Sequence, residues 1–238
     1  MKQKKRIIFI FILILNLGVA TVTACGFMGF GDTAKWKEEV LLHDGRKIVV
    51  ERWQKHGGRH EPGQEPDIKE HSITFTLPGT KQFIRWKDEY SEEIGRSNFK
   101  LVALHILNAT PYIITTPRLC ISYNKWGRPN PPYVIFKYER NAWKRIGLPE
   151  LPIEFKNINL VITTSGDEEE LVKLGLASAE KVKELNSSLT QAEYKTIVRT
   201  QLNPGALGVS CPDWGSSRWT SPKAPSQNCP KRKGMEKQ

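Results

Sequence analysis

Hydrophobic and polar residues alternate along much of residues 37–138 with the two-residue period that is typical of β-strands. Asp-Gly and Pro-Gly pairs interrupt the alternation where tight turns are expected. The pattern predicts three β-hairpins, formed by Lys37–Leu42 with Lys47–Trp53, by Ser72–Leu77 with Gln82–Lys87, and by Tyr133–Tyr138 with Trp143–Ile146. Between the first two hairpins, residues 54–70 are rich in glycine, proline and charge and predict a long exposed loop.

Further strands are predicted from apolar runs. Phe99–Leu107 is apolar almost throughout and predicts a buried central strand, although periodicity alone does not distinguish it from a helix. The shorter predicted strands are Tyr112–Thr115, Leu119–Tyr123 and Ile158–Thr163.

From residue 167 onward the pattern takes the period of helices. Asp167–Glu170 places four carboxylates in a first helical turn, where they complement the positive end of the helix. Two short helices are expected, followed by a better-marked helix that begins with a capping box between Thr190 and Glu193 and continues to Leu202. Strands followed by helices indicate an α+β domain: a mainly antiparallel sheet of hairpins and two or three short C-terminal helices.

The first 24 residues have the three zones of a secretory signal peptide: a basic cluster, an apolar run, and small residues that end at Ala24. Polar residues dilute the second half of the apolar run, which favours a cleaved signal peptide. The alternative is a retained membrane anchor.

The segment Val22-Thr23-Ala24-Cys25-Gly26 resembles the lipobox of bacterial lipoproteins. The resemblance implies cleavage before Cys25 and acylation of its thiol by chains such as palmitate, and two or more acyl chains give stable membrane anchoring. Because Gly26, and not aspartate, follows the cysteine, similarity to enterobacterial lipoproteins implies transfer to the outer membrane. The alternative is a plain secretory signal that leaves Cys25 as an ordinary thiol.

Composition and charge then define the expected organisation and partners. The chain has 238 residues, 39% hydrophobic and 26% charged, which fits one globular domain and excludes a disordered or fibrous protein. The predicted segments are a signal peptide (1–24), a glycine-rich tether (25–34), one α+β domain (35–202), and a disordered basic tail rich in proline, glycine and serine (203–238). The net charge of +11 favours anionic partners, which in a cell envelope are lipid head groups and polymers and not nucleic acid.

Three cysteines remain if Cys25 is acylated. An exported protein meets an oxidising compartment, so we expect a disulfide between Cys211 and Cys229 in the tail. Cys120 alternates with two apolar residues and is predicted to be a small buried hydrophobic residue in a strand.

Four histidines fall within one stretch of the N-terminal half: His43, His56, His60 and His71. A metal site requires imidazoles that converge on one point, but two glycines separate His56 from His60 and disfavour the helix that would align them. We therefore expect histidines on a solvated loop, no metal and no cofactor. No nucleophile motif is present, and an enzyme is not expected.

Basic and aromatic side chains are interleaved in the middle of the chain. The candidate surface for an anionic ligand consists of Lys125, Trp126, Arg128, Lys137, Arg140, Trp143, Lys144 and Arg145. Three prolines stiffen the loop around Trp126, and an exposed indole between cations would suit sugars or phosphates. The alternative is a strand connector in which Trp126 folds back onto the sheet.

Three segments, Asn124–Val134, Trp36–Trp53 and Ser72–Gly95, resemble a group of uncharacterised proteobacterial lipoproteins and hypothetical proteins. The resemblance covers about residues 35–165 and brings no activity, ligand or catalytic residue. The sequence thus predicts a lipid-anchored, non-catalytic binding or structural module that faces the periplasm, with an anionic envelope polymer or another envelope protein as partner. The alternative is a periplasmic enzyme or metal-binding protein that uses the four histidines.

Overall fold

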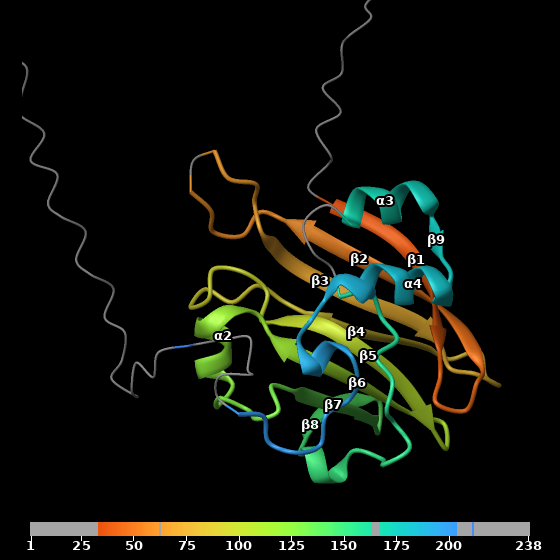
Figure 1. Cartoon of the computed structure of the whole chain (residues 1–238). Helices are drawn as coiled ribbons and strands as arrows, with labels where there is room; N and C mark the ends of the chain where they lie inside the picture. Colours follow the sequence, from red (N-terminus) through yellow and green to blue (C-terminus); the bar gives the residue numbers. More distant parts are fainter. Residues whose placement is uncertain (1–32, 62, 163–166, 204–210, 212–238) are drawn as a thin grey trace, which may run out of the picture.

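The computed structural model describes residues 33–61, 63–162, 167–203 and 211, and within them nine strands form two sheets (Figure 1). The first sheet has the strand order β4-β3-β2-β1-β9 and consists of β1 (Thr33–Leu41), β2 (Lys47–His56), β3 (Ile68–Thr76), β4 (Phe83–Asp88) and β9 (Leu176–Ala177). The second sheet follows the order of the chain: β5 (Phe99–Leu107), β6 (Thr110–Pro117), β7 (Val134–Glu139) and β8 (Ala142–Ile146). All pairings are antiparallel except that of β1 with β9.

The three predicted hairpins are confirmed, with β1 and β2 longer than expected. Strand β1 begins at Thr33, so the last two residues of the predicted tether belong to the sheet. Strand β2 ends at His56 and β3 begins at Ile68, which shortens the predicted loop to residues 57–67. Gly45 adopts a φ of 84° in the turn between β1 and β2, as expected for its Asp-Gly pair.

The main hydrophobic core lies between the two sheets. Alternate residues of the first sheet point inward, including Ile73, Phe75 and Leu77, which share one buried face as predicted. They pack against side chains of the second sheet such as Leu104 and Ile113.

The second sheet is covered on its other face as well. A second core cluster, which includes Tyr112, Ile114 and Phe155, forms between this sheet and chain segments that follow β8. Strand β5 is consequently buried over almost its whole length, which explains its nearly continuous apolar sequence. The predicted central position is wrong, because β5 lies at the edge of the second sheet.

A buried asparagine forms hydrogen bonds with backbone groups of β5 at this edge of the sheet. The side chain of Asn159 accepts a hydrogen bond from the backbone N–H of Leu104 and donates to the carbonyls of Leu104 and Leu41. The predicted strand Ile158–Thr163 is not formed by residues 158–162, because this side chain takes the place of a backbone ladder. Thr163 lies outside the described residues.

Two short helices, α3 (Asp167–Leu174) and α4 (Ala179–Leu185), follow the strands as predicted (Figure 1). They contribute Leu171 and Val182 to a third apolar cluster, in which they pack against Ala34 and Trp36 of β1. No described helix is long and apolar enough to span a membrane.

The third predicted helix, from Thr190 to Leu202, is wrong. Only a single 3-10 turn forms there, Ala192–Tyr194. Tertiary hydrogen bonds replace those of the helix, since the Tyr133 hydroxyl donates to the carbonyls of Glu193 and Thr196 and the Ile197 N–H donates to Lys156. Ile197 is still buried, but on an irregular backbone.

The prediction of a strand at Leu119–Tyr123 is also wrong, because Leu119–Lys125 forms helix α2. Pro117 pairs with Phe99, the first residue of β5, so a longer β6 would have no partner strand. The helix buries Ser122 and Tyr123, and its Cys120 forms a disulfide.

That disulfide joins Cys120 to Cys211 across 91 residues, so the predicted Cys211–Cys229 pairing is wrong. Cys211 is buried, and its carbonyl accepts a hydrogen bond from Arg128 at 3.2 Å, which ties a residue of the predicted tail to the domain. Cys25 and Cys229, most of the predicted tail, the signal peptide and most of the tether lie outside the described residues.

Candidate binding surface

The outer face of the first sheet, which points away from the main core, carries alternating exposed side chains. Strand β1 alternates strictly between exposed and buried positions from Thr33 to Glu38, and β4 does so along its whole length. Antiparallel pairing then aligns the outward-facing residues in rows across four strands, with the residues of β2 and β3 less exposed than those of β1 and β4. This face offers a continuous surface built on rigid elements.

A hollow of about 170 Å³ lies on this face. We call its six lining residues the sheet-face hollow: Lys35, Glu51, Trp53, Ser72, Thr74 and Arg85. They form two adjacent rows, in which Lys35 pairs with Trp53 and Trp53 with Ser72, while Glu51 pairs with Thr74 and Thr74 with Arg85. Strand register thus collects residues that are 50 positions apart in the sequence.

Positive charges outnumber negative ones around the hollow, where Glu51 is the one lining carboxylate. Among the described residues, Lys35, Lys37 and Arg85 form no ion pair, whereas Lys87 binds Glu70 at 3.0 Å and Glu89 at 3.1 Å. Arg85 donates to the hydroxyl of Ser72 at 3.2 Å, and Ser72 is the strand-pairing partner of Trp53. The half-buried indole of Trp53 therefore lies among cations that retain their charge for a ligand.

The basic and aromatic surface predicted from the sequence is mostly used within the fold. The Trp126 ring lies 4.6 Å from Phe99, centroid to centroid, and its N–H donates to Asn98 at 3.2 Å. The Arg145 guanidinium stacks on Trp126 at 5.4 Å from the ring centroid. Trp126 therefore folds back onto the sheet, which is the alternative considered above.

The other members of that surface also have intramolecular partners. Lys125 binds Glu93 at 3.4 Å, and both Lys137 and Lys144 bind Glu139 at 3.2 Å. Trp143 donates to the Arg85 carbonyl at 2.7 Å, and Arg128 donates to Asn124 at 2.6 Å. Arg140 is exposed in the turn between β7 and β8. The structure groups these residues, and two carboxylates, Glu93 and Glu139, pair with three of the six cations.

The four histidines do not converge. His43 packs against Phe155, with ring centroids 5.0 Å apart, while the His60 ring hydrogen-bonds to the Gly58 carbonyl. Nδ1 of His56 lies 3.1 Å from the Pro66 carbonyl. The described residues contain no group of three or more histidine, cysteine, aspartate or glutamate side chains suited to a metal.

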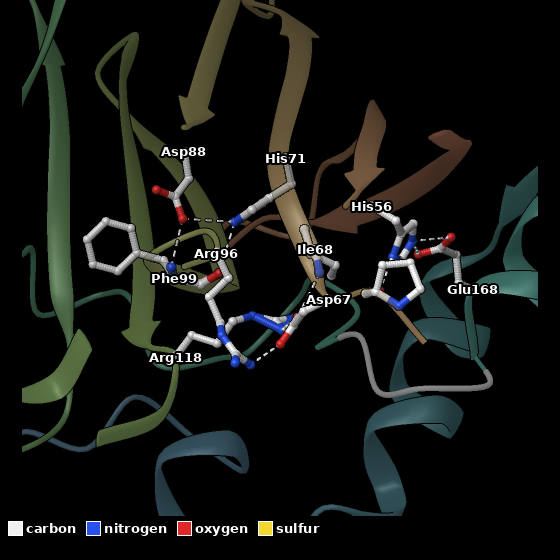
Figure 2. Close-up of polar contacts among 10 residues, drawn as sticks. His56, Asp67, Ile68, His71, Asp88, Arg96, Phe99, Arg118 and Glu168 are labelled. Carbon is white, nitrogen blue, oxygen red and sulfur yellow. Dashed lines mark hydrogen bonds and ion pairs between the residues drawn. The ribbon is translucent and has the colours of Figure 1, made fainter. Parts of the chain in front are cut away.

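Two of these histidines form separate polar contacts with carboxylates (Figure 2). His56 binds Glu168 of α3 at 2.9 Å, and this hydrogen bond raises the pKa of the imidazole. His71 lies 3.2 Å from Asp88, which also accepts the backbone N–H of Phe99 at 2.7 Å. Burial lowers the pKa of His71, so this imidazole is neutral near pH 7.

A third polar group in Figure 2 centres on Asp67, which sequence reasoning missed. Asp67 binds Arg96, and it also binds Arg118 at 3.2 Å. The sequence carried one signal for buried polar residues nearby, since Arg52 and Gln54 continue the inward-facing row that begins with Val50. The residues that contact these buried polar side chains come from other segments of the chain, so no local sequence pattern identified them.

Comparison of the chain with family models, curated proteins and solved structures found no match.

Proposed function

We propose that this protein is a lipid-anchored, non-catalytic module of the bacterial cell envelope, and that its sheet-face hollow binds an anionic glycan. The observation that carries the proposal is the position of Trp53 among Lys35, Lys37 and Arg85, which form no ion pair among the described residues and outnumber the one carboxylate of the hollow, Glu51. The indole supplies an apolar face for a sugar ring, and the cations attract phosphate or carboxylate groups.

The shape of the surface supports a polymer as the ligand. The hollow is open and extends over four strands, so a chain of sugars can lie across it, in contrast to an enclosed site for one small molecule. Thr74 adds a half-buried hydroxyl group that can hydrogen-bond to the ligand.

Two further observations support export to the envelope. Cys25 lies in the lipobox-like segment and would hold the processed N-terminus at a membrane through its acyl chains, with the outer membrane as the expected location. The disulfide between Cys120 and Cys211 is typical of proteins that leave the reducing cytosol.

Adsorption to lipopolysaccharide micelles tests the binding surface, with neutral dextran as the control polymer. Reversing two charges at the hollow, with Lys35→Glu and Arg85→Glu, should weaken adsorption by about tenfold or more at low ionic strength, and added salt should shrink the difference. Trp53→Ala should weaken it severalfold without changing the salt dependence.

The matched control reverses the same number of charges on the other candidate surface, with Arg140→Glu and Lys144→Glu. Because both variants have the same net charge, a general effect of charge would weaken them equally. Loss of adsorption in this control, with the Lys35 and Arg85 variant unaffected, would move the binding site to the hairpin of β7 and β8.

A further inference from the structure

A small polar cavity lies at one end of the main core, between the two sheets, away from the sheet-face hollow. Its lining residues are Arg52, Gln54, Ile68, His71, Phe99, Lys100, Leu101 and Arg118. The volume open to the centre of a water molecule is about 10 Å³, which is room for about one water or one ion of similar size.

Three cationic side chains, and no carboxylate, line this cavity. The Arg52 side chain is only 2% exposed and the Arg118 side chain 12% exposed. Lys100 is half-buried and forms no ion pair within the described part of the chain. Bringing three like charges together inside a protein is unfavourable unless something compensates them.

The surrounding carboxylates compensate the charge only in part. Glu38 binds Arg52 at 3.0 Å, Asp67 is shared by Arg96 and Arg118, and Asp88 contacts the neutral His71. Four cations, counting Arg96 and Lys100, therefore lie near three carboxylates. One positive charge remains uncompensated at the cavity.

Two hydrogen-bond donors among the residues that line the cavity also lack an acceptor. The Nε atoms of Arg52 and Arg118 are buried and have no hydrogen-bond partner. Their terminal nitrogens, in contrast, donate to Glu38 and Asp67. Buried guanidinium N–H groups without a partner are costly, and an acceptor in the cavity would remove that cost.

We propose that this cavity binds one chloride-sized monovalent anion, held by Arg52 Nε, Arg118 Nε and Lys100 Nζ. A monovalent anion cancels the single uncompensated charge and accepts hydrogen bonds from the two Nε–H groups that lack a partner. Its role is structural, because it joins β2 and β3 of the first sheet to β5 and the end of β6 in the second.

The test measures thermal unfolding against chloride concentration at constant ionic strength, with gluconate as the replacing anion. Because a ligand that binds only the folded state stabilises it by mass action, each tenfold increase of chloride above the dissociation constant should lower the unfolding equilibrium constant tenfold. Lys100→Met should abolish this response and should be more stable than the wild type in chloride-free buffer, since it removes the uncompensated charge.

Lys183→Met serves as the matched control, because Lys183 is exposed on α4 and does not line the cavity. It should retain the chloride response in full. Crystals soaked in bromide should show an anomalous peak between Arg52 and Arg118. Each of three results would overturn the proposal. The first is unfolding that does not depend on chloride, and the second is a chloride response that remains in Lys100→Met. The third is a cavity that holds water and no bromide.

Discussion

Cys120 and Cys211 form a disulfide that links helix α2 to a residue 91 positions later in the chain. Arg128 strengthens this junction, because its guanidinium donates to the Cys211 carbonyl and stacks on Tyr123 of the same helix at 5.3 Å. Further along the same loop, Asn130 exchanges two hydrogen bonds with the backbone of Leu202.

Replacing the disulfide by Cys120→Ser and Cys211→Ser should reduce the free energy of unfolding by roughly 2–5 kcal/mol, because a cross-link over a long loop restricts the unfolded chain. Urea denaturation with and without reductant checks this expectation. Reduced wild-type protein should match the double variant. A reductant effect that persists in the double variant would mean that another pair of cysteines forms the stabilising bond.

The proposed anchor predicts that Cys25→Ala blocks processing and lipid attachment. The precursor should keep its signal peptide, and labelled palmitate should not be incorporated, because the acylated thiol is absent. Intact mass of protein extracted from membranes measures cleavage and acylation together. Cys229→Ala is the matched control and should be processed and labelled like the wild type.

His105 should make the domain sensitive to acid. Its ring is buried and stacks on Phe155 at 4.7 Å between centroids, and burial lowers its pKa to about 4. The unfolded chain therefore takes up a proton below pH 6.5 that the folded state does not, and roughly 3 kcal/mol of stability should be lost between pH 6.5 and pH 4.

Unfolding free energies of the wild type and His105→Gln, measured across this pH range, test the assignment. The variant should show a shallower loss towards acid pH, with the remainder due partly to His71, whose pKa burial also lowers. Parallel pH profiles would show that His105 does not carry the effect.

His56 should change the free energy of unfolding with pH in the direction opposite to His105. Its hydrogen bond to Glu168 raises its pKa, so the folded state holds the proton more tightly than the unfolded chain. This contribution is complete below pH 6.5 and is lost as the pH rises through the raised pKa. His56→Gln should cost about 1 kcal/mol at pH 5.5 and much less at pH 9.

The matched control for that prediction is His60→Gln, because the His60 ring faces the Gly58 carbonyl and not a carboxylate. Its effect on stability should not vary with pH in the same way. An equal cost of His56→Gln at pH 5.5 and pH 9 would exclude an ionic contact with Glu168.

The parts of the fold that depend on local pattern could be predicted from the sequence. Alternation and the Asp44-Gly45 turn located the first hairpin, and the carboxylates of Asp167–Glu170 located α3. Predictions failed where long-range contacts outweigh local preference. The Tyr133 hydroxyl satisfies backbone groups around Glu193 in place of a helix, and the lack of a strand partner beyond Phe99 ends β6 and allows α2.

The candidate site was harder to predict because its residues are scattered. Lys35, Trp53 and Arg85 form no motif, and only the register of four strands brings them together. The contiguous basic and aromatic segment around Trp126 was easier to recognise in the sequence, but the Trp126 indole already contacts Phe99 and Arg145. Inward-facing Arg52 was the clearest sign in the sequence that the core contains polar residues.

The most direct test of the proposed binding surface is a two-dimensional NMR titration of the isotope-labelled domain with the soluble core oligosaccharide of lipopolysaccharide. Binding at the sheet-face hollow should produce saturable shifts of the Trp53 indole N–H and of backbone amides near Lys35, Thr74 and Arg85, with little change in the Trp126 indole N–H. Shifts confined to the hairpin of β7 and β8, or no shifts at concentrations that give adsorption, would contradict it.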